Sequence, residues 1–176
     1  MEFTLCVNDR HCYRGDFFDT PVPREHLKKI MEAGLAAPSG CNKQTTFLTA
    51  VDDPTLLQRM KAALDPQFAL TAPAFICVLT KHVSCYNGKC YSVQDYSAAI
   101  ENMLLAITDL GYSSCWYEGY VTEPNGVNER LRAILNVPEE LDLVCVLPVG
   151  KAKEEGPRPR KKPFEMRAWF NGFEAE

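Results

Sequence analysis

The sequence predicts one domain of the α/β or α+β class, with a β-sheet covered by helices on both faces. Its 176 residues match the length of a single domain, and a hydrophobic content of 46% is enough for a sizeable core. Apolar residues recur at helical spacing in some segments and form short continuous runs in others. The alternation of these two patterns, taken alone, suggests a doubly wound parallel sheet.

Four segments show the helical pattern. Asp53 is a capping residue, and Pro54 occupies the first helical position, where a missing N–H costs nothing. Gly111 ends the third segment, and Pro138 ends the fourth. The third segment has the widest apolar stripe, which predicts a central and largely buried helix. The predicted helices cover residues 23–36, 54–64, 92–110 and 124–136.

Four other segments are candidate strands. The runs at 73–80 and 142–149 are continuously apolar, as is typical of strands that are buried on both faces. Two further strands are predicted at 46–51 and 114–120. Together these segments supply the sheet that the helices cover.

Residues 152–176 show no clear period and are rich in glycine and proline, so we expect them to form an extended arm. The arm carries too many large apolar side chains to leave in water, which predicts that it covers a surface. A partner subunit is a natural candidate for that surface. The side chains concerned are Phe164, Met166, Trp169, Phe170 and Phe173.

The charges divide the chain into an acidic body and a basic arm. The formal net charge is −4 and the isoelectric point is near 5.5, which argues against a protein that coats nucleic acid. Residues 151–167 nevertheless contain seven basic and three acidic residues. No apolar run approaches the roughly 20 residues that span a bilayer, so we expect no membrane partner.

The sequence contains eight cysteines, which could form disulfides in a secreted protein or bind a metal. The N-terminus lacks the basic and apolar regions of a secretory signal, so we expect a cytoplasmic protein with reduced thiols. There is no C-x-x-C pair, and the three histidines form no zinc motif, so no metal site is expected. Cys85 and Cys90 lie in the short segment 81–91, for which a plain loop and a redox-active lid are both open interpretations.

The common cofactor and nucleophile motifs are missing from this sequence. There is no Gly-x-Gly, which excludes the dinucleotide-binding fingerprint and the kinase glycine loop, and neither Gly-Lys pair belongs to a P-loop. No Gly-x-Ser-x-Gly nucleophile motif is present. We therefore expect no catalytic side-chain nucleophile.

Four patches differ from ordinary scaffold. Residues 10–14 cluster two arginines and a histidine, and residues 36–44 lead from a helix into a loop of small and amide residues. Residues 115–120 place aromatic side chains beside a glycine, and residues 158–160 are Arg-Pro-Arg. Each patch can also be interpreted without any function. In the order given, the four patches would then be a solvated turn, an ordinary helix end, an edge strand with core aromatics and a solvated run of charge.

In this order the four patches resemble those of the nitroreductase family of FMN-dependent oxidoreductases, over nearly the whole chain. The first matches the family's Arg-(Arg/His)-Ser-x-(Arg/Lys), with Cys12 in place of serine. The second matches Ala-Pro-Ser-x-x-Asn-x-Gln, although Thr45 and Thr46 follow where the family commonly has proline and an aromatic residue. The third and fourth are similar to the segment after the family's central helix and to its C-terminal phosphate arm.

The resemblance implies a set of contacts with FMN. Arg10, Arg158 and Arg160, assisted by His11, would bind the phosphate and ribityl chain, because guanidinium groups suit a dianion. Arg14 would lie at the N1–C2=O edge of the flavin, where a cation stabilises the reduced ring. Backbone N–H groups around Glu118 and Gly119 would lie near flavin N5, with Trp116 and Tyr117 against one ring face. The remaining cofactor-binding residues would be Cys12, Pro38, Ser39, Gly40 and Asn42, the last four meeting the flavin of the other subunit.

The resemblance also implies a fold and an assembly. The fold would be an α+β three-layer sandwich, in which a mixed β-sheet is covered by helices. Residues 1–151 would form the FMN-binding core, and residues 152–176 would form a C-terminal arm of the same domain, exchanged across a homodimer.

The implied activity is transfer of hydride from NADPH or NADH to a small-molecule electron acceptor, such as a nitroaromatic or a quinone, by a ping-pong mechanism. One alternative is a flavin-binding protein for storage or sensing, or a family member with specialised flavin chemistry such as dehalogenation or flavin fragmentation. Another is a dimeric interaction module whose arm binds a partner through its charge.

Overall fold

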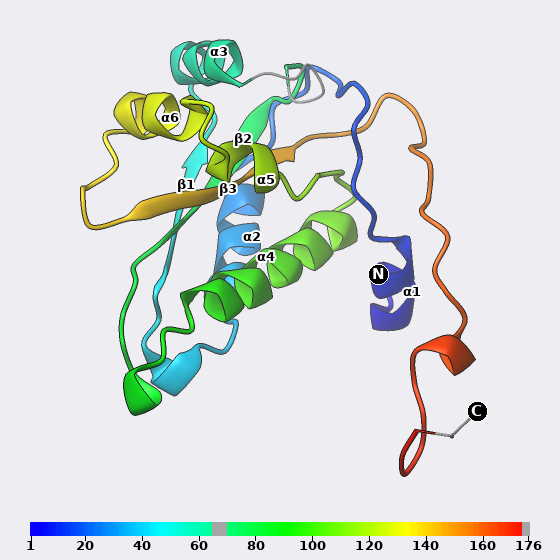
Figure 1. Ribbon diagram of the computed structural model, residues 1–176. Coiled ribbons are helices and arrows are strands. Elements are labelled where there is room, and N and C mark those ends of the chain that lie inside the picture. Colours follow the sequence, from blue (N-terminus) through cyan, green and yellow to red (C-terminus); the bar gives the residue numbers. More distant parts are fainter. Residues whose placement is uncertain (65–69, 174–176) are drawn as a thin grey trace.

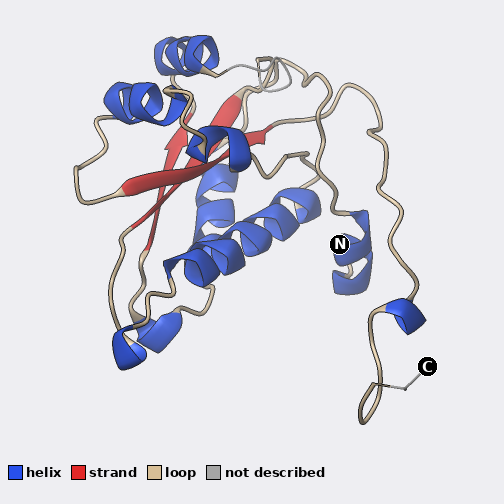
Figure 2. Ribbon diagram, viewed as in Figure 1, coloured by secondary structure: helices blue, strands red, loops and turns tan. Residues whose placement is uncertain are grey.

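The computed structural model describes residues 1–64 and 70–173. Figures 1 and 2 show a small sheet between two groups of helices. The α-helices are α1 (Phe3–Asp9), α2 (Arg24–Leu35), α3 (Pro54–Ala63), α4 (Ser92–Asp109), α5 (Gly119–Thr122) and α6 (Val127–Leu135). The strands are β1 (Thr46–Val51), β2 (Ala74–Thr80) and β3 (Asp142–Val149). Short 3₁₀ helices are η1 (Gly40–Asn42), η3 (Tyr86–Gly88) and η4 (Phe164–Met166).

The three strands form one antiparallel sheet in the order β1-β2-β3. All residues of the central strand β2 are buried, and its last residue, Thr80, pairs with Thr46 of β1 and with Asp142 of β3. The predicted α+β class is confirmed. Among the described residues, however, the sheet is antiparallel rather than mixed, and the parallel pairing between Cys12 and Ser114 is an isolated bridge.

Alternate side chains of β2 point into two separate cores, as the two-residue period of a strand requires. Phe75, Cys77 and Leu79 belong to a hydrophobic cluster with residues of α3, α5 and α6. The even-numbered side chains from Ala74 to Val78 pack against α2 and α4 in a second cluster. Helices therefore cover both faces of the sheet (Figure 1), and the predicted three-layer arrangement is confirmed.

The predicted helices form close to their expected bounds because local contacts define their ends. The side chain of Asp53 accepts a hydrogen bond of 2.8 Å from the N–H of Leu56 and caps α3. Helix α6 begins later than expected because Gly126 adopts a left-handed conformation and the Asn125 side chain accepts from the N–H of Val127. Helix α4, with 18 residues, is the central buried helix that the sequence predicts.

The predicted strand at 114–120 is wrong. This segment makes only isolated bridges, which join Ser114 to Cys12 and Tyr117 to Val146, and α5 begins at Gly119. The side chain of Glu118 is hydrogen-bonded to Tyr96 of α4, while Tyr117 makes its single bridge to β3. Helix α1 is not predicted either, because Cys6 is its one buried residue and it shows no apolar stripe.

The residues after β3 form an extended arm, as predicted. Its large apolar side chains are exposed in the single chain, from 41% for Trp169 to 83% for Phe170. Figure 1 shows the arm leaving the body of the fold and ending far from the sheet. In the part of the chain that the structure describes, no helix is both long and apolar enough to cross a membrane.

Candidate functional site

The motif at residues 10–14 is fixed to the core on two sides. The N–H of Tyr13 donates to the carbonyl of Ser114 over 2.7 Å, and the Tyr13 ring is buried. Arg10 Nε lies 3.2 Å from Oε1 of Glu101, which belongs to α4. The motif is thus held between α4 and the segment that leads to α5.

The C-terminal arm crosses this motif at Gly156. A Cβ atom at Gly156 would lie 3.0 Å from the ring of Tyr13 and 3.3 Å from Nε2 of His11, so the absence of a side chain permits the close approach. Arg158 Nη1 lies 2.5 Å from Oδ1 of Asp9 at the end of α1. These contacts anchor the first part of the arm on the N-terminal motif.

A cleft of about 550 Å³ lies between the motif and the arm. Cys12 and Arg14 line it from one side, and residues 154–159, including Arg158, line it from the other. Arg14 is exposed and forms no ion pair with any described residue. Glu154 and Glu155 also line this space, which we call the cationic cleft after its two arginines, Arg14 and Arg158.

Two polar atoms beside the cationic cleft have no partner. Nε2 of His11 and Oγ of Ser114 are buried without a hydrogen bond to any described residue. Both residues line a neighbouring cavity of about 180 Å³, together with Arg10. Since an unpaired buried polar atom costs free energy, these atoms mark a place where a polar ligand or water is favoured.

The thiol of Cys12 lies at the edge of the cationic cleft and is acidified by its neighbours. A hydrogen bond with Cys115 lowers the pKa of Cys12 to about 5, and the positive charges of Arg14 and Arg10 act in the same direction against the effect of burial. The same hydrogen bond, together with burial, raises the pKa of Cys115. The surroundings of Cys12 therefore favour the thiolate form.

The loop at residues 38–44 is fixed to the first turn of α4 through Asp95. The buried Asp95 carboxylate accepts from the N–H of Gly40 and from the hydroxyl of Thr45, each over 2.7 Å. The N–H of Gln44 donates to Ser39 Oγ over 2.9 Å, and Asn42 has a left-handed backbone. Pro38 and Ser39 line a separate cavity of about 300 Å³ with Gln44 and Asp95.

The aromatic side chains of residues 115–120 lie on both faces of the sheet. Trp116 Nε1 donates to Glu118 Oε2 over 2.7 Å, and the hydroxyl of Tyr96 on α4 donates to Oε1 over 2.9 Å. Burial and the Glu118 carboxylate raise the pKa of Tyr96 to about 12. Tyr117 is instead buried in the cluster under α3, α5 and α6, where its ring stacks on Tyr120. The rings of Trp116 and Tyr117 therefore do not lie side by side.

The structure brings some of the sequence-predicted residues together and separates others. Cys12, Arg14 and Arg158 share the cationic cleft, and His11 lies beside it. Arg10 is already paired with Glu101, and Gly119 is exposed at the start of α5. Arg160 is exposed on the arm beyond the cleft. The residues Pro38, Ser39, Gly40 and Asn42 lie at the opposite end of α4 (Figure 1).

Comparison with known proteins bears on the family of the chain. The model of the nitroreductase family matches residues 7–74 and 54–151, which together make up most of the chain. The chain belongs to the nitroreductase family.

Individual members of the nitroreductase family resemble the chain over most of its length. An Archaeoglobus fulgidus protein named "Putative NADH dehydrogenase/NAD(P)H nitroreductase" is 34% identical over 79% of each chain. The solved structure of a protein of the same name from Bacteroides thetaiotaomicron covers 98% of this chain and 99% of its own, with a TM-score of 0.82 and 25% identity. The structure of a nitroreductase with bound FMN from Bacteroides fragilis covers 97% of this chain and 98% of its own, with a TM-score of 0.75 and 25% identity.

Three residues that position the site in this nitroreductase were not identified from the sequence. They are Asp95, Tyr96 and Glu101, which hold the 38–44 loop, Glu118 and Arg10 respectively. All three lie on α4, so one helix aligns three separate patches. For Asp95 and Glu101 the available signal was a carboxylate within an otherwise apolar helical stripe, whereas Tyr96 carried no such signal.

Proposed function

We propose that this nitroreductase-family chain is an FMN-dependent oxidoreductase that takes hydride from NADPH or NADH and passes it to electron-poor acceptors such as nitroaromatics or quinones. The observation that carries the proposal is the cationic cleft between the N-terminal motif and the arm. The FMN bound to the Bacteroides fragilis relative supports the choice of cofactor.

The residues around the cationic cleft fit FMN. Its volume of about 550 Å³ lies in the range of about 300–1,000 Å³ that is usual for ligand sites. Arg14 has no ion-pair partner among the described residues and offers the bidentate donors that a phosphate or a flavin carbonyl accepts. Arg158 would share its guanidinium between Asp9 and the ligand, and Arg160 follows on the same arm. The unpaired Nε2 of His11 supplies a further polar contact at the edge of the cleft.

The lowered pKa of Cys12 bears on the charge balance of this site. An ordinary member of the family has serine here, whereas Cys12 can place a negative charge beside Arg14. An anionic ligand in the cleft would compete with a Cys12 thiolate for the guanidinium groups of Arg10 and Arg14. We therefore expect FMN binding to raise the pKa of Cys12.

The chain's own residues would bind and orient the cofactor, and none need act as a nucleophile. When bound, FMN supplies the acceptance and donation of hydride. Arg14 and Arg158 would hold the anionic and carbonyl groups, while the hydrogen bonds from Trp116 and Tyr96 to Glu118 fix the backbone of the segment that enters α5.

We further propose that the functional unit is a homodimer. Phe164, Phe170 and Phe173 are exposed by 58%, 83% and 82% in the single chain, so a second copy would bury a substantial apolar area. The loop at 38–44 lies at the end of α4 remote from the cationic cleft. A second copy could bring this loop to the cleft, as the family resemblance implies.

The test is the visible spectrum of the purified protein under anaerobic conditions, before and after addition of NADPH or NADH. We expect a bound flavin that bleaches with at least one donor and regains its colour when a quinone or a nitroaromatic is added. A flavin that binds and is reduced by neither donor would contradict the proposed activity and favour storage or sensing. Protein that takes up no FMN would contradict the cofactor assignment and favour the interaction module.

A further inference from the structure

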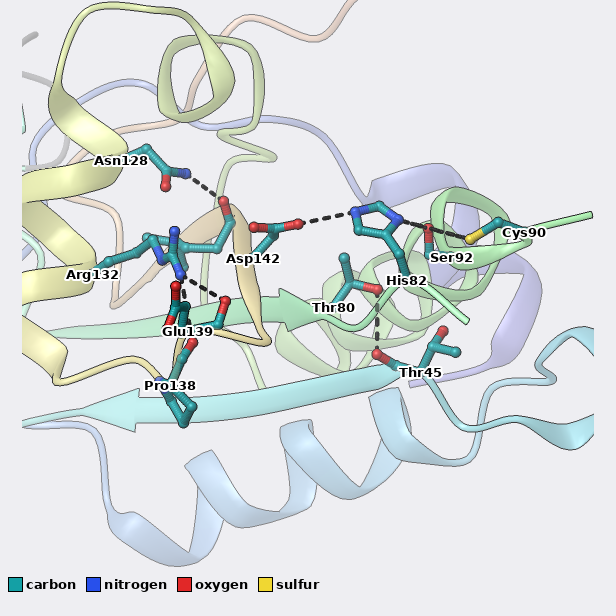
Figure 3. Close-up of polar contacts among 11 residues, drawn as sticks. Thr45, Thr80, His82, Cys90, Ser92, Asn128, Arg132, Pro138, Glu139 and Asp142 are labelled. Atoms are coloured by element: carbon teal, nitrogen blue, oxygen red, sulfur yellow. Dashed lines mark hydrogen bonds and ion pairs between the residues drawn. The ribbon is translucent and has the colours of Figure 1, made fainter. Parts of the chain in front are cut away.

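A second cluster of reactive groups lies on the surface at the first turn of α4, away from the cationic cleft. It consists of Cys90, Ser92, His82 and Asp142, which come from three separate elements (Figure 3). Ser92 is buried, whereas the side chains of His82 and Asp142 are 59% and 51% exposed and Cys90 is exposed.

The sheet and one turn bring these residues together. Asp142 begins β3 and pairs in register with Thr80, the last residue of β2, so His82 follows β2 at the place where β3 starts. The N–H of Lys81 donates to the carbonyl of Thr45 over 2.9 Å, which fixes the chain as it leaves β2. The bridge between Ser84 and Cys90 then closes the loop and returns Cys90 to His82.

The four side chains form a continuous polar chain. Oδ2 of Asp142 lies 3.0 Å from Nε2 of His82. Nδ1 of His82 lies 3.0 Å from Oγ of Ser92 and 3.8 Å from Sγ of Cys90, and Sγ of Cys90 lies 3.3 Å from Oγ of Ser92. A cysteine, a histidine and an orienting carboxylate in this order are the arrangement that activates a thiol nucleophile.

We propose that Cys90 is a nucleophilic thiol that forms mixed disulfides with anionic low-molecular-weight disulfides. His82 and Asp142 activate it, and Ser92 lies between the thiol and His82. The Cys90 proton moves to Nδ1 of His82, directly or through the hydroxyl of Ser92, and Asp142 holds the resulting imidazolium. The Cys90 thiolate then attacks one sulfur of the disulfide, the S–S bond breaks, and the leaving thiolate takes the proton from His82. One S–S bond forms and one breaks, so no other oxidant is needed.

The surroundings of Cys90 favour this chemistry over one that needs an enclosed substrate. The thiol is open to solvent, so a disulfide can approach it. Lys81 and Lys89 are exposed on the same loop, and the carboxylate of the cluster, Asp142, is paired with His82, which together favour an anionic partner. The titratable groups that face Cys90 are His82, from the loop after β2, and behind it Asp142 of β3.

The acid–base properties agree with this geometry. Hydrogen bonds from the hydroxyl and N–H of Ser92, and then from His82, lower the pKa of Cys90 to about 7. Cys90 and Asp142 together raise the pKa of His82. A pKa near the ambient pH is the optimum for an attacking thiol in disulfide exchange. Cys85, in the same loop, has a raised pKa because of burial and its contact with Cys41, and it is a matched control.

The experiment exposes the reduced, full-length protein as purified to oxidised glutathione across a range of pH, and follows each cysteine by mass spectrometry of tryptic peptides. Trypsin cleaves after Lys89, so Cys85 and Cys90 fall on different peptides, and fragment ions distinguish Cys90 from Cys115 within the peptide 90–130. We expect Cys90 to be modified faster than Cys85, with a rate that rises around pH 7. Cys90→Ser should abolish that adduct, and Cys85→Ser should leave the rate at Cys90 unchanged.

His82→Ala and Asp142→Asn test the activation itself. A complete return of the Cys90 pKa to about 8.5 would lower the thiolate fraction at pH 7 about 15-fold and raise the nucleophilicity about fivefold, a net loss of about threefold in rate. This loss is the upper bound for the two variants, because both keep the hydrogen bonds from Ser92. The midpoint of the pH profile should move upward in both variants. Modification of Cys85 as fast as Cys90, or a midpoint that His82→Ala does not move, would overturn the proposal.

Discussion

The guanidinium of Arg10 lies 3.2 Å from the carboxylate of Glu101, and this ion pair joins the N-terminal motif to the middle of α4. The Arg10 side chain is only 19% exposed, so Glu101 is the partner that makes its burial tolerable. The position of the motif beside the cationic cleft therefore depends on a helix that does not itself line that cleft.

Glu101→Gln should lower the free energy of unfolding by about 1 kcal/mol, because it leaves a mostly buried cation with a neutral partner. Urea denaturation measures the change. The matched control is Glu32→Gln, which removes the exposed pair with Lys28 on α2 and should cost less than about 0.5 kcal/mol. Equal losses in the two variants would show that the Arg10 pair has no special role.

Gly156→Val should displace the arm from the N-terminal motif, because its Cβ atom would already lie 3.0 Å from the ring of Tyr13. We expect FMN affinity to fall about tenfold or more, since misplacing Arg158 removes a charge-assisted contact. Fluorescence titration with FMN measures it. Gly172→Val is the control on the same arm, because a Cβ atom there meets nothing within 4 Å. A weaker effect of Gly156→Val than of the control would contradict the contact.

Cys115→Ala should raise the pKa of Cys12 from about 5, because it removes the hydrogen bond that chiefly lowers this pKa. The pH dependence of iodoacetamide labelling at Cys12, followed by mass spectrometry, measures the change. Cys41→Ala, at an exposed cysteine, is the control and should leave that profile unaltered.

The contact between Cys12 and Cys115 also predicts how the stability of the fold depends on pH. The folded pKa of Cys12 is below its unfolded value of about 8.5, so its ionisation stabilises the fold fully above pH 8.5, and the contribution is lost as the pH falls toward 5. In Cys115→Ala this decline between pH 8.5 and 5 should become smaller. Thermal unfolding across that range would contradict the account if the two proteins showed the same slope.

Serine substitutions at Phe170 and Phe173 should weaken the homodimer, because these rings are more than 80% exposed in the single chain and need a second copy to cover them. Light scattering coupled to gel filtration should show a shift toward monomer on dilution. Tyr86→Ser, at a ring that is 63% exposed on the loop 81–91, is the control. A wild-type protein that is already monomeric would contradict the proposed exchange of arms.

The sequence was most informative where the hydrophobic period was strong. The continuous runs at 73–80 and 142–149 became β2 and β3, and the wide stripe at 92–110 became α4. The segment at 114–120 has the composition of a strand, but the contacts of Glu118 with Trp116 and Tyr96 decide its path. Such contacts depend on tertiary packing, which composition does not encode.

The residues of the candidate site, too, could be predicted only in part. Motif resemblance identified Arg14 and Arg158, which the structure brings to one cleft. It did not identify Asp95 or Glu101, because their roles depend on what α4 packs against. Nor could it relate His82 to Asp142, which are brought together by the pairing of Thr80 with Asp142 at the end of the sheet.

The most direct test of the central claim is the affinity of the protein for FMN, measured by calorimetric titration for the wild type and for Arg14→Ala, Arg158→Ala and Arg24→Ala. The account predicts stoichiometric binding to the wild type and a loss of about tenfold or more for each of the two cleft arginines, since a charge-assisted hydrogen bond contributes about 1.5–3 kcal/mol. Arg24, paired with Asp52 on the surface, should be replaceable without loss. No binding of FMN, or equal affinity in all four proteins, would contradict the assignment of the cationic cleft.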